Sequence, residues 1–190
     1  KSITSRTKVI SLAYITNVIG DIRPMREIID YAHQKGILVV GDGAQSMSHL
    51  KMNVTLDDID FFVASAHKMY GPTGVGFLYG KFDLLNEMDP TSYGGGMNAM
   101  YLKDGYVELR EVPTKFEAGT QNIAGVIGMG KAISYLENIG MNKIMKHEHE
   151  LKNYLVSKLK EFDNIIIYNE DTVGSIVTFN VKDIFSQDTA

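Results

Sequence analysis

Short apolar runs recur along the first half of the chain, and each ends at polar or glycine-rich residues. Val9–Asn17 is rich in apolar and β-branched residues, which is typical of a buried strand. Ile37–Val40 and Phe61–Ala64 are two further runs, and Val75–Tyr79 follows a glycine-proline turn. A helix is expected after the first run, where Pro24 suits a first helical turn. The order strand, helix, strand, short helix, strand predicts an α/β fold with a mainly parallel sheet flanked by helices.

Longer helical patterns dominate the second half. Ile123–Leu136 contains many small and apolar residues and is expected to form a largely buried helix. Asn142–Phe162 has the pattern of a long amphipathic helix, with lysines and glutamates on its polar side. Its expected apolar stripe consists of residues at helical spacing: Ile144, Leu151, Leu155, Leu159 and Phe162.

The chain is expected to contain parts of two domains. Residues 1–140 are predicted to be a large cofactor-binding domain that lacks its N-terminal part. Residues 141–190 are predicted to be a connecting long helix and the beginning of a truncated small C-terminal α+β domain, with strands at Ile165–Tyr168 and Ser175–Val181. Because the chain starts without methionine and ends without an evident helix stop, we expect it to be the central part of a longer protein.

Composition narrows the function classes. The 190 residues are 44% hydrophobic and 22% charged, which is ordinary globular composition. A formal net charge of −4 argues against a nucleic acid or an anionic membrane surface as the main partner. No apolar run approaches the roughly 18 residues of a membrane span. The chain has no cysteine, which excludes disulfides and thiol nucleophiles within it, and a reducing, cytoplasmic location is the default expectation.

Polar residues follow the predicted strands at their carboxyl ends. These residues are Asn17, Asp42 and the group Ser65, His67 and Lys68. In proteins with parallel sheets, functional side chains commonly lie at the carboxyl ends of the strands. A carboxylate that follows a buried run is costly without a partner, and a lysine in such a place offers an amine that can attack a carbonyl.

One cofactor uses both of these groups. Pyridoxal phosphate forms a Schiff base with a lysine, and an acidic residue keeps its ring nitrogen protonated. Lys68 and Asp42 are the candidates, Ser65 and His67 are placed to bind the phosphate, and Gln45 is placed to reach the phenolic oxygen. Each residue alone is more commonly a turn or surface residue. The combination on successive strands favours the cofactor.

Three segments carry a resemblance to a known family. Asp42–Gln45 (DGAQ) followed by Ser65–Gly74 (SAHKMYGPTG) closely resembles the cysteine desulfurases of the class V aminotransferase family. Phe116–Asn122 (FEAGTQN) resembles the motif of the group that contains the SufS-like desulfurases and the selenocysteine lyases. The resemblance extends over nearly the whole chain.

The resemblance implies fold type I of the pyridoxal-phosphate enzymes and a homodimer. Lys68 would form the Schiff base, Asp42 would pair with the ring nitrogen, and Gln45 would bond the phenolic oxygen. The other implied cofactor-binding residues are Ser65 and His67 at the phosphate, Asn17 beside the ring and substrate, and Thr120 at the phosphate of the neighbouring subunit. The loop Gly94–Gly96 would lie near the active-site mouth of the dimer.

The implied reaction converts L-cysteine to L-alanine and passes the sulfur, as a persulfide, to an acceptor protein of iron–sulfur cluster assembly. Desulfurases of this family use a C-terminal cysteine as nucleophile and arginines to hold the substrate carboxylate. An N-terminal segment supplies a histidine that stacks on the ring. None of these has a counterpart in the 190 residues, so we do not expect efficient sulfur transfer from this chain alone.

Two alternatives remain open. A selenocysteine lyase or another class V aminotransferase would share Lys68 and Asp42 and differ in the C-terminal region. A non-catalytic scaffold or binding domain would keep the fold alone, although packing does not require that pair of residues. No metal site is expected, because His147 and His149 do not share one helix face and are expected at the surface.

Overall fold

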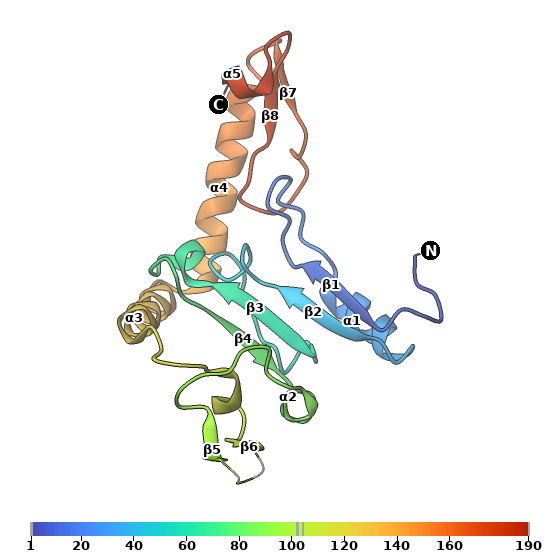
Figure 1. Cartoon of the computed structure of the whole chain (residues 1–190). Helices are drawn as coiled ribbons and strands as arrows, with labels where there is room; N and C mark the ends of the chain where they lie inside the picture. Colours follow the sequence, from blue (N-terminus) through green and yellow to red (C-terminus); the bar gives the residue numbers. More distant parts are fainter. Residues whose placement is uncertain (1, 102, 104, 190) are drawn as a thin grey trace.

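A four-stranded sheet lies at the centre of the molecule, and the computed structural model describes residues 2–101, 103 and 105–189 (Figure 1). The strand order is β1-β2-β3-β4. These strands are β1 (Val9–Ala13), β2 (Leu38–Asp42), β3 (Phe61–Ser65) and β4 (Gly76–Gly80). The first three run parallel, and β4 is antiparallel to β3. The predicted α/β fold with a mainly parallel sheet is confirmed.

Helices and two small antiparallel sheets complete the described fold. The α-helices are α1 (Met25–His33), α2 (Phe82–Glu87), α3 (Ile123–Ile139), α4 (Met141–Leu159) and α5 (Ser186–Thr189). The 3₁₀ segments are η1 (Ala66–Met69) and η2 (Thr114–Phe116). The small sheets pair β5 (Asn98–Tyr101) with β6 (Val107–Leu109) and β7 (Ile165–Ile167) with β8 (Phe179–Val181). In Figure 1, α4 leads away from the central sheet to β7, β8 and α5.

The main hydrophobic core lies between α1 and the central sheet. Ile29 and Ala32 of α1 are fully buried, as are Val39 of β2 and Ile59. Phe62 of β3 is 1% exposed and is part of the same cluster. The apolar residues of α1 recur at helical spacing, so one face of the helix covers the alternating buried positions of the strands.

The first strand and the first connections differ from their predictions. β1 ends at Ala13, lies at an edge of the four-stranded sheet and is only partly buried, so the expected buried strand over Val9–Asn17 is wrong in both respects. Asn17 lies in the loop after the strand. The short helix expected between the second and third strands is absent, because residues 44–49 form consecutive turns.

The buried faces of the two long helices also differ. In α3, Ile123 and Ile127 are 64% and 70% exposed, so the helix is not largely buried within the described chain. In α4, Leu151 is 54% exposed whereas Lys152 and Val156 are buried. The packed side of α4 is therefore rotated from the predicted stripe, because its neighbours contact the side that carries Lys152.

The region after Gly140 contains α4, β7, β8 and α5. The division into domains at residue 140 stays a prediction. Within the described residues, no helix has both the length and the apolar character that crossing a membrane requires.

Candidate active site

The carboxyl ends of β2 and β3 lie side by side, as the parallel pattern predicts. Asp42 is the last residue of β2, and its Cα pairs with Val63 of β3. Ser65 ends β3, and η1 follows it directly with His67 and Lys68. Because the two strands are parallel, the polar residues that follow them are placed at one edge of the sheet.

The amine of Lys68 is the point at which three separate segments meet. Its Nζ donates hydrogen bonds to Gln45 Oε1 at 3.2 Å and to Asn17 Oδ1 at 3.3 Å. Gln45 belongs to the turns after β2, and Asn17 belongs to the loop after β1. Both acceptors are neutral amides, so they orient the amine without the Coulomb attraction of an ion pair. The structure thus brings together Lys68, Gln45 and Asn17 of the predicted site.

Main-chain contacts around η1 determine the position of the Lys68 backbone. Ala66 is fully buried, and its N–H donates to Val75 O at 3.0 Å. The segment ends at Tyr70, which has a left-handed backbone with φ of 64°. Gly71 then passes so close to Ala66 that an added Cβ would lie 2.9 Å from the Ala66 carbonyl oxygen. This close approach explains why the motif has a glycine at position 71.

Asp42 is held at the strand end by its main chain and its side chain. Its Oδ1 accepts a hydrogen bond from Ala44 N–H at 2.8 Å, and its carbonyl accepts one from Tyr14 N–H at 2.9 Å. The side chain itself is exposed. The carboxylate is therefore ordered and accessible, which suits the binding of a protonated ring nitrogen.

Tyr14 packs against Gly41, the residue that precedes Asp42 in β2. Its ring fills the space beside Gly41, where an added Cβ would lie 2.6 Å from Tyr14 Cε2 and 2.5 Å from Ile59 Cδ1. Its hydroxyl donates to Asp57 Oδ2 at 3.3 Å. Burial, together with the neighbouring Asp57 carboxylate, raises the pKa of Tyr14, so the hydroxyl remains a donor.

Ser65 and His67 flank buried Ala66 at the same edge. Ser65 is half-buried and His67 is exposed. Both are within three residues of Lys68 in the sequence. Their role in binding a phosphate stays a prediction.

Thr120 belongs to a different loop, and it is exposed. The preceding Gly119 donates its N–H to Gly95 O at 2.8 Å, which joins this loop to Gly94–Gly96. Asn122 Nδ2 donates to Gly74 O at 3.3 Å, in the turn after Lys68. Among the described residues, Thr120 forms no hydrogen bond with the Lys68 group, and its predicted contact lies in a neighbouring subunit.

The donor set at this edge fits pyridoxal phosphate. An amine held by neutral amide oxygens can combine with an aldehyde, and an exposed carboxylate on the adjacent strand can hold a protonated ring nitrogen. Among the described residues, no group of three or more His, Asp or Glu side chains is arranged so that it could hold a metal ion. His147 and His149 are both exposed.

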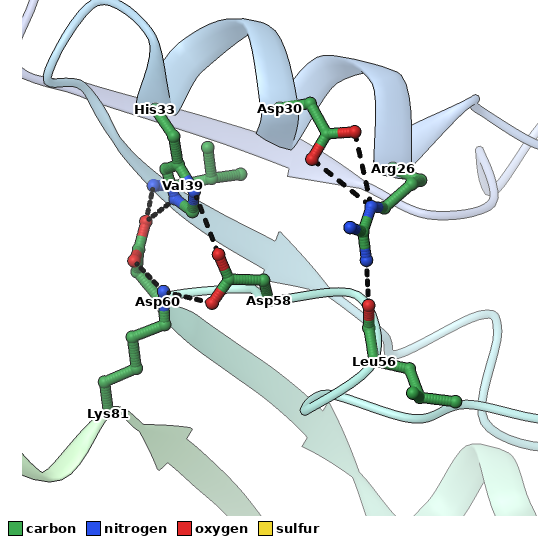
Figure 2. A network of polar contacts seen from close by, with 8 residues as sticks. All are labelled: Arg26, Asp30, His33, Val39, Leu56, Asp58, Asp60 and Lys81. Atoms are coloured by element: carbon green, nitrogen blue, oxygen red, sulfur yellow. Dashed lines mark hydrogen bonds and ion pairs between the residues drawn. The ribbon is translucent and has the colours of Figure 1, made fainter.

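A charged network at the opposite edge of the sheet was not predicted (Figure 2). Asp60 precedes β3, and its carboxylate accepts hydrogen bonds from Val39 N–H and from His33 Nε2, each at 2.8 Å, and from Lys81 Nζ at 2.9 Å. Asp58 contacts His33 at 3.3 Å and Lys81 at 2.8 Å. His33 is the last residue of α1, and these contacts join the helix to the sheet.

A second unpredicted contact ties the site region to α4. His49, which is four residues after Gln45, contacts Glu148 Oε1 of α4 through Nδ1 at 2.8 Å. Both side chains are 21% exposed. The two residues are 99 positions apart, so local sequence patterns give no sign of this contact.

Comparisons with known proteins show to which proteins the chain is similar. The family model described as aminotransferase class-V matches residues 1–190. A probable cysteine desulfurase of Halalkalibacterium halodurans is 44% identical over 191 residues, which cover 100% of this chain and 47% of the relative. The chain spans about half the length of the curated relatives that it matches.

Solved structures show the same fold. The cysteine desulfurase CsdA from Escherichia coli superposes with a TM-score of 0.92 at 34% identity, covering 98% of this chain and 46% of that one. The apo cysteine desulfurase from Thermococcus onnurineus gives 0.91 at 34% identity, covering 96% of this chain and 46% of that one.

Proposed function

This chain belongs to the class-V aminotransferase family, and from that premise we propose that the protein carrying it is a pyridoxal-phosphate-dependent cysteine desulfurase. The proposed reaction converts L-cysteine to L-alanine. The substrate's C–S bond breaks, its sulfur forms an S–S bond with a cysteine thiol of the enzyme, and the carbon that loses sulfur gains a proton. The products are alanine and an enzyme persulfide.

The observation that carries the proposal is the position of the Lys68 amine. It lies beyond the carboxyl end of β3, held by the amide oxygens of Gln45 and Asn17, and Asp42 ends the adjacent parallel strand. Relatives named as cysteine desulfurases support the choice of substrate.

Seven residues of this chain would hold the cofactor. Lys68 would hold it covalently through its amine, Asp42 would bond the ring nitrogen, and Gln45 would donate to the phenolic oxygen through its amide N–H. The others are Ser65 and His67 for the phosphate, Asn17 beside the ring, and Thr120 for the phosphate bound to the partner subunit. When bound, pyridoxal phosphate supplies an electron-withdrawing ring that favours loss of a proton from the substrate's Cα.

The chain's own residues then supply orientation and proton transfer. Lys68 would take and return protons at Cα and the neighbouring atoms as a general base and acid. Asn17 and Gln45 hold the Lys68 amine by hydrogen bonds, which would limit its motion during proton transfer. The Asp42 carboxylate, fixed by Ala44 N–H, would keep the ring nitrogen protonated.

Further components of the proposal lie outside these residues. The thiol that receives sulfur must come from elsewhere, because the 190 residues contain no cysteine. The proposal includes a homodimer, in which Thr120 reaches the partner's cofactor, and a sulfur-acceptor protein of iron–sulfur cluster assembly. It also includes a cytoplasmic location, where a reducing environment keeps acceptor thiols free.

The test measures alanine formed from L-cysteine by the full-length protein, together with the absorption band of lysine-bound pyridoxal phosphate. We expect Lys68→Ala to abolish both, whereas Lys146→Ala, which changes a lysine side chain that is 78% exposed, should preserve both. A band and an activity that survive Lys68→Ala would refute the proposal. Turnover of L-selenocysteine without turnover of L-cysteine would identify a selenocysteine lyase instead.

A further inference from the structure

The loop that carries Asn17 is compact, but its tip points away from the central sheet. Thr16 N–H donates to Asp21 O at 3.1 Å, and Gly20 N–H donates to Thr16 O at 3.0 Å. Asp21 N–H donates to Thr16 Oγ1 at 3.1 Å. These bonds close the base of the loop. They leave the carbonyl groups of the tip to be bonded from elsewhere.

Residues from the far end of the chain bond those carbonyl groups. Asn169 is 3% exposed, and its Nδ2 donates to Ile19 O and, at 2.8 Å, to Ile176 O. Its Oδ1 accepts from Thr178 N–H at 2.8 Å. The Thr178 hydroxyl donates to the adjacent loop carbonyl, Val18 O. Figure 1 shows the loop after β1 extending to the segment that leads into β8.

A buried ammonium group holds Asn169 in turn. Lys152 of α4 is 2% exposed, and its Nζ donates to Asn169 O at 2.9 Å and to Thr172 O and Thr172 Oγ1, both at 2.6 Å. All three donors of the amine are therefore used on one turn of the chain. Because a buried amine is costly unless fully bonded, Lys152 fixes the conformation of that turn and the position of Asn169.

Steric contact reinforces these hydrogen bonds. Gly20 has φ of +71°, and an added Cβ there would lie 2.8 Å from Ile176 Cβ. Gly174 lies against the loop's main chain, where an added Cβ would lie 2.4 Å from Gly20 O. The loop therefore packs against the backbone of Gly174 and the side chain of Ile176.

We propose that Asn169, fixed by Lys152, is a positioning residue for the active site. With Thr178 it holds the Thr16–Asp21 loop where the Asn17 amide oxygen meets the amine of Lys68. Asn169 touches no reacting group and acts through Asn17. The importance of that contact for cofactor binding rests on the proposed function, whereas the positioning of the loop does not.

The first experiment measures the loop directly by amide hydrogen exchange in the full-length protein. Asn169→Ala should speed exchange at Gly20 and Asp21 by about tenfold, the factor that corresponds to the loss of one hydrogen bond of typical strength. Asn180→Ala is the matched control, because Asn180 of β8 bonds Tyr168 Oη at 3.1 Å and, within the described part of the chain, has no hydrogen bond to the Thr16–Asp21 loop. Equal exchange in Asn169→Ala and the wild type would overturn the proposal.

A second pair of variants tests the proposal if Asn169→Ala does not fold. Thr178→Val keeps the side-chain shape but removes the hydroxyl that donates to Val18 O, whereas Thr178→Ser keeps the hydroxyl. We expect faster exchange of the loop in the valine variant and wild-type exchange in the serine variant. Identical behaviour of the two variants would contradict the role of this hydrogen bond.

The second experiment measures the dissociation constant of pyridoxal phosphate in a double-mutant cycle. Asn169→Ala should weaken binding several-fold when Asn17 is present, and it should have no further effect in an Asn17→Ala background. An equal loss in both backgrounds would show that Asn169 does not act through Asn17. If wild type and Lys68→Ala bind the cofactor equally, the proposed function fails, and the exchange experiment alone decides whether Asn169 positions the loop.

Discussion

Replacing Asp60 with asparagine removes the central carboxylate of the network in Figure 2. Its side chain is 4% exposed and accepts hydrogen bonds from His33, Val39 N–H and Lys81. Burial acts to raise the pKa of Asp60, but these three hydrogen bonds outweigh burial and lower the pKa below the ordinary value of 3.8. The native state therefore favours the charged form.

The expected loss of unfolding free energy follows from the hydrogen bonds that asparagine can still make. A hydrogen bond to a charged group contributes about 1.5–3 kcal/mol, and the variant retains one side-chain oxygen that can still accept from Val39 N–H. His33 and Lys81 both retain Asp58 as a partner, so neither side chain is left without an acidic contact. We expect Asp60→Asn to lower the free energy of unfolding by roughly 2–3 kcal/mol at pH 7.

The assay is urea unfolding followed by circular dichroism between pH 3 and pH 7. Because folding lowers the pKa of Asp60, its contribution is fully present above the unfolded pKa and is lost as the pH falls through the folded pKa. The difference between wild type and Asp60→Asn should therefore be largest near pH 7 and should shrink below about pH 4.

Asp58→Asn is the matched control, because Asp58 contacts the same two side chains, His33 and Lys81, but is 56% exposed. Solvent screening limits its expected cost to less than about 1 kcal/mol. The reasoning is refuted if Asp58→Asn costs as much as Asp60→Asn, or if the effect of Asp60→Asn is the same at pH 3 and pH 7.

Three further changes have distinct expected results. Gly43→Ala should destabilise the fold by about 1–3 kcal/mol, because the added Cβ would lie 1.9 Å from Phe62 Cζ; an unchanged thermal midpoint would show that the ring can move aside. Glu148→Gln should lower the free energy of unfolding by about 1 kcal/mol, because it weakens the contact of α4 with His49; equal stability of the variant and wild type in urea would contradict a stabilising pair. Asp42→Asn should lower kcat with L-cysteine by roughly 100-fold, the typical effect of losing one electrostatic partner at a reacting centre, and kcat within twofold of wild type would remove Asp42 from the proposed mechanism.

The sequence was sufficient to predict the mainly parallel sheet and the strand ends that lie beside Lys68. Buried parallel strands appear as continuous apolar runs, so the ends of β2 and β3 were visible at Asp42 and Ser65. Gln45 and Lys68 then came together as the strand order requires. Asn17 was predicted to end the first strand, but it lies in the following loop, because β1 ends at Ala13.

Contacts between residues distant in sequence were beyond such reasoning. Lys152 was assigned to the polar side of α4, yet it is buried because the carbonyls of residues 169 and 172 satisfy its amine. Among the described residues, Asp60 has no local partner, because its partners come from α1, β2 and the residue that follows β4. Periodicity records only local spacing, so it cannot identify polar groups that find their partners through the tertiary fold.

The most direct test of the central claim locates the cofactor on the chain. The full-length protein is incubated with pyridoxal phosphate, the covalent link is reduced with borohydride, and the modified peptide is identified by mass spectrometry. The proposed function predicts a single pyridoxyl modification on Lys68, which is lost in Lys68→Ala. Specific modification of another lysine, or no modification of Lys68 at saturating cofactor, would contradict it.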